Sequence, residues 1–296
     1  MVENSASGTS SLRTKQPLKR LLGRERLVLL SFLGPGLIVL TLVFFLPLAN
    51  FLVQGFLSPE PGVQNFISSL GDPVYRRILV DTLEVSLITA AACAVLGYPV
   101  AYALSTGSPR TRLIIFALVL IPFWTNILVR MFAWIAVLGS HGIVNTTLIA
   151  LGLIEVPIKI LYTRFAVVLG MTQFLLPYMI LACYAVMANI PSSLLDAAAN
   201  LGARPRSVFV RVYFPLSAPG LVAGFLLVFI ISLGFFVTPA LLGPQDQKLL
   251  AQVIENQVND TLNWGFAAAL SIILVVVTTM LYAVYDQLLT TAGDKR

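Results

Sequence analysis

A polar loop between two long apolar segments contains residue types whose spacing suits docking against another protein. The loop offers one acid, a run of alanines, a glycine and a proline, with arginines close by. Alanine side chains are small enough to pack closely in a partner's groove, and the acid supplies one charged contact. The residues of this pattern are Asp196, Ala197, Ala198, Gly202, Arg204 and Pro215.

The same loop has the start and stop signals of two short helices. Hydroxyls at 192–193 can cap a helix that holds Asp196 in its first turn, where the helix dipole favours an acid. Gly202 can end this helix in a left-handed conformation, and Pro205 suits the first turn of a second helix running toward Pro215. Without further context, an ordinary helix–turn–helix flanked by arginines explains the pattern equally well.

A second group of polar residues lies inside an apolar segment. Pro122 is followed at intervals of four by Asn126, Arg130 and Trp134, which places them on one face of a helix. We expect Pro122 to kink this helix and free a backbone carbonyl. A charged arginine in lipid costs about 2.5–3.5 kcal/mol, which favours a stripe facing protein or a water-filled path, with Trp124 as a further path candidate. The alternative is that Arg130 snorkels to the outer headgroups.

Acidic residues near the ends of apolar segments are few. Asp81 and Glu84 open one segment, and Glu255 lies in a later polar stretch. Asp81 and Glu84 have three possible roles: an acidic mouth for a cationic solute, a pair with Arg130, or markers of the membrane interface. Glu255 is either a similar contact or a solvated loop charge.

Patterns for catalysis, metal binding and cofactor binding are missing from the sequence. His141 is the single histidine, and Cys93 and Cys183 both lie in apolar segments, where a free cysteine acts as a small hydrophobe. The phosphate-binding pattern G-x-x-x-x-G-K-[ST] does not occur. The sequence therefore predicts a non-catalytic protein without a metal or a cofactor.

Composition determines which elements position these residues. The 296 residues are 58% hydrophobic and only 11% charged, with a mean hydropathy of +0.90. A surface facing lipid explains such a composition, so we predict an all-α membrane protein with one transmembrane domain. Each predicted span is long enough to cross about 30 Å of hydrocarbon. The predicted spans are 28–56, 82–104, 113–139, 162–187, 219–243 and 264–290.

The distribution of lysine and arginine predicts the orientation. Thirteen of these residues fall in the two termini and in the second-to-third and fourth-to-fifth connections, against four in the other connections. The positive-inside rule then places both termini and the Asp196 loop in the cytoplasm. The net charge of +6 thus reports topology and does not point to a nucleic-acid partner.

The predicted domain organisation is simple. A basic tail over 1–26 is expected to be disordered, and 27–296 form the transmembrane domain, with the cytoplasmic loop at 188–218. Apolar residues recur at helical spacing between 249 and 258, which predicts a short external amphipathic helix on the bundle or membrane surface.

The Asp196 loop resembles the EAA loop of ABC-importer permeases. Asp-Ala-Ala, a glycine four positions later and Val212-Tyr213-Phe214-Pro215 follow that pattern, with Asp in place of the usual Glu. The shorter acid keeps the charge, so details of its contact differ. Further likeness to spermidine/putrescine-type permeases extends over roughly 75–285 and is carried by 121–126, 129–130, Gly139, Gly142, Asn145, 152–160, 176–179 and 215–220.

This resemblance implies a type I ABC importer permease fold with six transmembrane helices in the bacterial inner membrane. It also implies partners: ATPase subunits that the loop contacts, a second permease (a heterodimer in polyamine importers) and a periplasmic substrate-binding protein. ATP hydrolysis would then take place on a separate chain. The implied function is transport of a small solute, most specifically spermidine or putrescine.

Other functions remain open at this stage. One alternative is an importer of another solute, such as an amino acid derivative, a phosphonate or iron, since acids along the path are few. A secondary transporter also fits six spans with internal prolines and an arginine, although the EAA-like loop and the absence of inverted halves argue against it. A structural membrane scaffold leaves the polar stripe unexplained.

Overall fold

The computed structural model describes residues 33–58 and 60–293, so the tail predicted at 1–26 lies outside it. The chain divides into two compact units, Met1–Val53 and Gln54–Arg296. Residues 33–53, the described part of the first unit, are helical and include a π-helical turn, η1 (Thr41–Phe45). Helix α2 (Leu46–Leu57) begins in the first unit and ends in the second.

Within the described residues the fold is all-α, which confirms the predicted fold class. The described residues contain six helical segments that are long and apolar enough to cross a membrane, the number that the sequence predicts. They are Leu33–Leu57, Pro73–Thr106, Ile127–Ala150, Arg164–Met187, Pro205–Leu233 and Trp264–Ala283.

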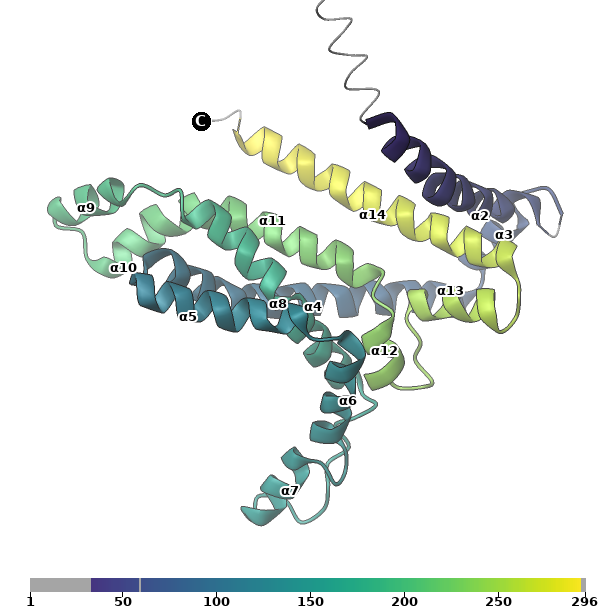
Figure 1. Ribbon diagram of the computed structural model, residues 1–296, viewed down its shortest axis with the longest axis horizontal. Coiled ribbons are helices and arrows are strands. Elements are labelled where there is room, and N and C mark those ends of the chain that lie inside the picture. Colours follow the sequence, from purple (N-terminus) through teal and green to yellow (C-terminus); the bar gives the residue numbers. More distant parts are fainter. Residues whose placement is uncertain (1–32, 59, 294–296) are drawn as a thin grey trace, which may run out of the picture. The chain divides into compact units, whose positions relative to one another are not determined.

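Three long helices form the core of the second unit. Helices α4 (Pro73–Thr106), α8 (Arg164–Met187) and α11 (Phe214–Leu233) make the most extensive contacts in the molecule (Figure 1). Cys93, Leu175 and Val228, one from each helix, are completely buried in this core. Since lipid gives helices little hydrophobic reason to associate, close packing must hold them together.

Glycines make this close packing possible, and Met179 of α8 fills the notches they leave. A Cβ atom on Gly97 of α4 would lie 2.8 Å from Met179 Cγ, and one on Gly224 of α11 would lie 2.8 Å from Met179 Sδ. A Cβ atom on Gly220 would approach Val186 Cβ to 2.8 Å. The two neighbouring helices therefore approach α8 at positions where a larger residue does not fit.

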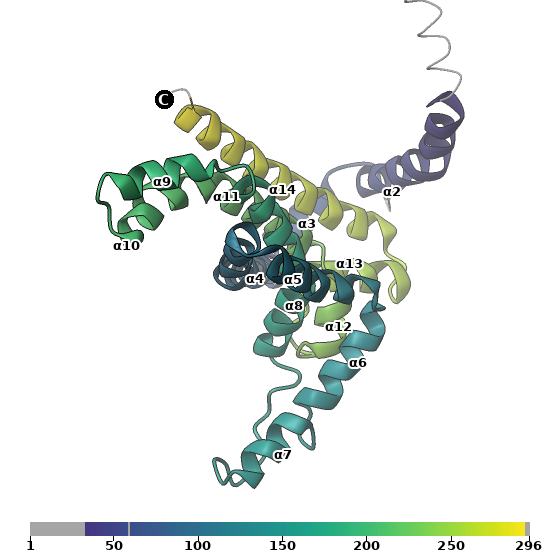
Figure 2. The ribbon, with the colours of Figure 1, turned by 60° about the vertical axis from the view of Figure 1, so that its left-hand side comes forward.

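The predicted continuous span 113–139 is wrong, because the chain breaks in its middle. Helix α5 (Pro109–Leu120) leads into a 3₁₀ turn, η2 (Ile121–Trp124), and α6 (Ile127–Leu138) then starts in a new direction. Pro122 has no backbone N–H, and the Asn126 side chain accepts a hydrogen bond from the N–H of Leu128 (2.8 Å), which starts a fresh helix. Figures 1 and 2 show α6 and α7 (Ile143–Ala150) projecting away from α4, α8 and α11.

The fifth span also has different bounds from the predicted 219–243. Helix α10 (Pro205–Val208), a π-helical turn η3 (Phe209–Tyr213) and α11 form one uninterrupted helical run. The run ends at Gly234, and α12 (Val237–Leu242) follows as a separate short helix. Pro205 provides an early start because its ring is preorganised for a first helical turn.

The remaining helices are α3 (Gln64–Gly71), α9 (Ser192–Asn200), α13 (Leu250–Asn259) and α14 (Trp264–Gly293). The amphipathic helix predicted near 249–258 is confirmed as α13. Its buried residues Leu250 and Val253 pack in one cluster with Phe266 and Leu270 of α14. The apolar face of α13 therefore lies on the helical bundle.

Candidate functional site

Helix α9 lies at the end of the second unit where α4 ends, and it presents its surface outward. Asp196, Ala197 and Ala199 are exposed, as are the large side chains of Leu194 (46%) and Leu201 (89%). An apolar surface of this kind beside a single acid is suited to contact with another protein. The main contacts of α9 within the chain are with α10 and η3.

Two details of the predicted helix start are wrong. The N-cap of α9 is Pro191, and neither serine hydroxyl caps the helix. Asp196 is the fifth residue of α9, so it lies in the second turn and not in the first. Because the helix dipole acts within the first turn, it does not stabilise Asp196, whose side chain lies on the outward face of α9.

The turn after α9 has the predicted geometry. Gly202 has φ +84°, a left-handed conformation that glycine adopts without strain. Its N–H donates to Ala199 O (2.9 Å), and the N–H of Ala203 donates to Ala198 O (3.1 Å), so the turn satisfies carbonyls at the helix end. Arg204 then serves as the N-cap residue of α10. Residues 196–202 thus end in one tight turn, and they are named the α9 corner.

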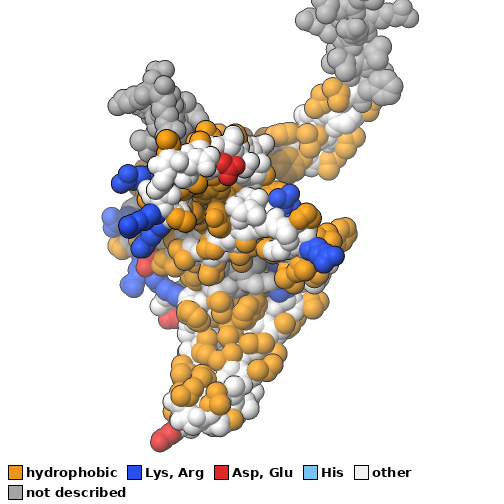
Figure 3. Space-filling model, turned by 90° about the vertical axis from the view of Figure 1, so that its left-hand side faces the viewer, with side chains coloured by type: hydrophobic (Ala, Val, Ile, Leu, Met, Phe, Trp, Pro, Cys, Tyr) orange, Lys and Arg blue, Asp and Glu red, His pale blue; other side chains and the backbone are white. Residues whose placement is uncertain are grey.

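A groove of about 300 Å³ separates α9 from the transmembrane helices. Asp196 and Leu195 line one wall, and the rings of Tyr102, Phe209 and Tyr213 line the other. Figure 3 looks onto this end of the molecule and shows basic side chains among apolar ones. Five arginines here are exposed: Arg110, Arg112, Arg204, Arg206 and Arg211.

The helix break around η2 gives Arg130 a role that spacing alone did not reveal. Its guanidinium donates to Pro122 O, and also to Thr125 O (3.3 Å) and Thr125 Oγ1 (2.7 Å). It also lies over the ring of Phe174 on α8, 5.3 Å from the ring centroid. The Pro122 carbonyl also accepts from the N–H and the hydroxyl of Thr125 (3.2 and 2.7 Å), so Arg130 donates to the last carbonyls of the 3₁₀ turn and ties α6 back to it.

The expected shared helix face is wrong for Pro122, which lies in η2, before α6 begins. Asn126 is exposed at the N-cap of α6, while Trp134 is half-buried and packs against Met131 and Leu138. Trp124, at the break itself, has 91% of its surface exposed. The break therefore presents Trp124 and Asn126 together on the surface and directs Trp134 into a packing cluster.

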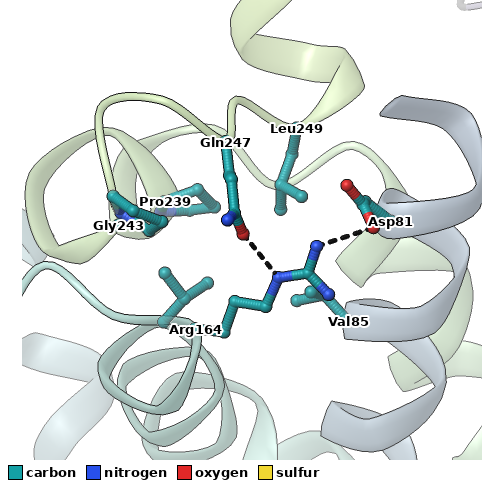
Figure 4. Close-up of a pocket in the computed structure, with 9 residues that line it drawn as sticks. Asp81, Val85, Arg164, Pro239, Gly243, Gln247 and Leu249 are labelled. Carbon is teal, nitrogen blue, oxygen red and sulfur yellow. Dashed lines mark hydrogen bonds and ion pairs between the residues drawn. The ribbon is translucent and has the colours of Figure 1, made fainter. Parts of the chain in front are cut away.

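At the opposite end of α4, the acids bind Arg164 and not Arg130. Arg164 Nη2 lies 2.7 Å from Asp81 Oδ1, and Arg164 Nη1 lies 3.3 Å from Glu84 Oε2. Arg164 Nε donates to Gln247 Oε1 (2.8 Å), so one guanidinium joins α4, the start of α8 and the loop before α13 (Figure 4). Nothing in the spacing of the sequence points to Arg164 as the partner of these acids.

Further contacts fasten α13 to this end of the bundle. The N–H of Leu250 donates to the buried hydroxyl of Thr82 (2.9 Å). Glu255 accepts a hydrogen bond from Asn259 Nδ2 (3.1 Å) within α13 and is half-buried. Among the described residues, no group of three or more His, Cys, Asp or Glu side chains could hold a metal ion.

The part of the chain that contains α8, α9 and α11 also matches a known family profile. Residues 94–290 match the family described as the inner membrane component of binding-protein-dependent transport systems. The chain belongs to this family. It is therefore a multi-pass inner-membrane permease component, and α9 with Gly202 lies inside the matched region.

Curated relatives of this permease are similar over most of their length. The spermidine/putrescine transport system permease protein PotB of Haemophilus influenzae is 37% identical over 254 residues, which cover 82% of this chain and 88% of that protein. The protein of the same name in Escherichia coli K12 is 36% identical, with 82% and 92% covered. Both relatives are transport permeases by name.

A solved structure supports the fold of the permease. A chain of a bacterial ABC transporter that imports the acidic polysaccharide alginate superposes with a TM-score of 0.74 at 18% identity, covering 92% of this chain and 98% of that one. At this identity the likeness concerns the fold alone. The fold is that of ABC importer permeases, as predicted.

Proposed function

We propose that this permease forms half of the translocation path of a polyamine importer and is driven by ATP hydrolysis on a separate chain. The observation that carries the proposal is the exposed α9 corner, which combines Asp196, small alanines and the left-handed Gly202. The names of the two PotB relatives support spermidine or putrescine as the solute. A heterodimer with a sister permease and delivery by a periplasmic binding protein complete the proposed assembly.

In the proposed orientation, α9 faces the cytoplasm and α13 faces the periplasm. The exposed arginines beside α9 support this assignment, since positive loops stay inside. The acids Asp81, Glu84 and Glu255 then lie on the outer side, where a cation arrives. Both termini, which lie outside the described residues at 1–32 and 294–296, belong to the cytoplasmic side in this arrangement.

The proposed path passes the helix break. Trp124 and Asn126 are exposed there, and Arg130 closes the break behind them. An indole face attracts an alkylammonium group by cation–π interaction, which suits a polyamine. Trp134, the remaining residue of the predicted path, is half-buried. Cysteines introduced at 124 and 126 should react with small hydrophilic thiol reagents at rates that change when ATP is added, and unchanged rates would contradict this path.

The docking role of α9 is tested by substitutions at the corner. We expect Gly202→Asp and Asp196→Lys to leave the protein in the membrane but to lose the ATPase subunits on co-purification, because the first strains the turn and the second inverts the docking charge. Gly152→Asp is a matched control, since Gly152 also has positive φ (+69°) and open space around it. Glu155→Lys is the control for charge inversion at an exposed acid elsewhere. Normal ATPase yield in both corner variants would refute docking at α9.

The solute is tested on the cognate binding protein. Its titration with putrescine, spermidine, amino acids, phosphonates and ferric ion should show binding of the two polyamines alone. Binding of a different compound alone would overturn the polyamine assignment and leave the ABC permease assignment unaffected.

A further inference from the structure

Two pairs of hydroxyl groups join α4 to the helical run that follows α9. Tyr98 Oη of α4 lies 2.7 Å from Ser217 Oγ of α11, and Ser105 Oγ of α4 lies 2.6 Å from Tyr213 Oη of η3. Both bonds are partly buried and connect residues more than 100 positions apart. They are specific links between α4 and the helical run to which the α9 corner is attached.

Aromatic rings surround these bonds. Tyr102 packs edge-on against Phe209 (5.5 Å between centroids) and against Tyr213 (5.0 Å), and Phe209 stacks on Tyr213 (5.9 Å). Tyr98 packs edge-on against Phe214 at 5.7 Å. Aromatic pairs in such geometries stabilise their contact beyond the area they bury, so α4 and η3 hold each other in a defined register.

The helical run changes its winding at this contact. Residues Phe209–Tyr213 form a π-helical turn between α10 and α11. π-helical turns are rare and frequently mark functional sites, because the wider turn interrupts the regular i to i−4 hydrogen bonding. The turn lies between the α9 corner and the transmembrane part of α11, so a displacement of α9 reaches α11 through η3.

We propose that Tyr98 and Tyr213 are positioning residues that transmit displacement of α9 to α4. The inference rests on the proposed docking of an ATPase at α9. Because α9 contacts the rest of the chain mainly through α10 and η3, a push on α9 moves η3 first. The Tyr213–Ser105 bond passes this motion to the end of α4, and the Tyr98–Ser217 bond keeps α11 in step with α4.

The two tyrosines can be altered without leaving a buried hydroxyl unpaired. Ser217 Oγ also donates to Phe214 O (3.1 Å), and Ser105 Oγ also donates to Tyr102 O (2.9 Å). Replacing either tyrosine by phenylalanine therefore removes one bond, keeps the ring and leaves each serine with its second partner. Such a change tests the link and not the fold.

The experiment uses the complete importer in proteoliposomes, with spermidine uptake and ATP hydrolysis measured in parallel. We expect Tyr98→Phe and Tyr213→Phe each to lower the spermidine imported per ATP by roughly twofold to tenfold, the range that loss of one neutral hydrogen bond gives. ATPase subunits should co-purify in normal yield, because neither hydroxyl belongs to the α9 surface. Loss of co-purification would concern docking, so the two proposals fail separately.

Controls and a second readout separate transmission from general damage. Tyr184 of α8 packs its ring against Phe116, with 5.0 Å between the centroids. Tyr184→Phe removes its hydroxyl and should leave the spermidine imported per ATP at the wild-type value. Spin labels at Val210→Cys in η3 and Val74→Cys in α4, both exposed in the wild type, report the motion without any transported solute. Their distance should change with ATP in wild type, and less in the double tyrosine variant.

A double-mutant cycle tests the bond itself. Tyr98→Phe and Ser217→Ala should have effects on the ratio that are clearly less than additive, because either change alone breaks the same bond. Three results would overturn the proposal: a normal ratio in the double tyrosine variant, an equal loss in Tyr184→Phe, or additive effects in the cycle.

Discussion

Replacing Asp81 by asparagine removes the shorter of the two ion pairs that hold Arg164. The charged hydrogen bond at 2.7 Å would be worth about 1.5–3 kcal/mol if it were well shielded. The Arg164 side chain is 39% exposed and that of Asp81 is 16% exposed, so solvent screens part of the interaction. We therefore expect Asp81→Asn to cost about 1–2 kcal/mol of stability.

Glu84 provides a control on the same helix and against the same arginine. Its carboxylate lies 3.3 Å from Arg164, and its side chain is 52% exposed. Exposed pairs of this kind contribute about 0–1 kcal/mol and weaken with salt. Glu84→Gln should therefore cost less than half as much as Asp81→Asn, and high salt should diminish the difference from wild type.

The assay is thermal unfolding of the purified permease in detergent, followed by helical circular dichroism. One to two kcal/mol corresponds to a fall in Tm of roughly 2–6 °C for a chain of this size. Arg164→Gln should cost the most, and combining it with Asp81→Asn should add little, because both remove the same pair. A larger effect of Glu84→Gln than of Asp81→Asn, or full additivity of the double variant, would refute this reasoning.

Two further predictions concern packing and the α6–α7 segment. Gly220→Ala should destabilise the protein by roughly 1–3 kcal/mol in the same assay, because the added Cβ would press on Val186. Gly234→Ala should be tolerated, because only its chain neighbours lie within 4 Å of the added Cβ. Asn145→Ala should speed proteolysis between residues 151 and 160, since this buried side chain exchanges two hydrogen bonds with the backbone of Ile158 (2.8 and 3.0 Å); cleavage at the wild-type rate would contradict it.

Much of this fold follows from composition and local residue signals. Long apolar runs predict six spans because helices alone satisfy their backbone in lipid, and the described residues contain six candidate spans, although the third and the fifth have other bounds than predicted. The turn at Gly202 and the amphipathic helix α13 also follow from local signals, a glycine at a helix end and apolar residues at helical spacing. These features depend on near neighbours in sequence, which is why they could be predicted.

Features that depend on distant contacts could not be predicted in the same way. Pro122 signals a kink, but the extent of the break depends on Asn126 starting a new helix and on Arg130 donating a hydrogen bond to the Pro122 carbonyl. The pairing of Arg164 with Asp81 spans 83 positions, and nothing in the spacing selects Arg164 over Arg130. The tyrosine bonds to α11 and η3 have the same long-range character.

The notch-filling role of Met179 has an evolutionary consequence. This one side chain occupies the space above Gly97 on α4 and beside Gly224 on α11, so the identities of all three residues are coupled. A homologue with a larger residue at either glycine position needs a smaller one at position 179, while a homologue that keeps both glycines can retain methionine, whose unbranched chain adapts to irregular gaps. The three positions should therefore covary among relatives. A substitution at one of them alone should be rarer than simultaneous substitutions at two.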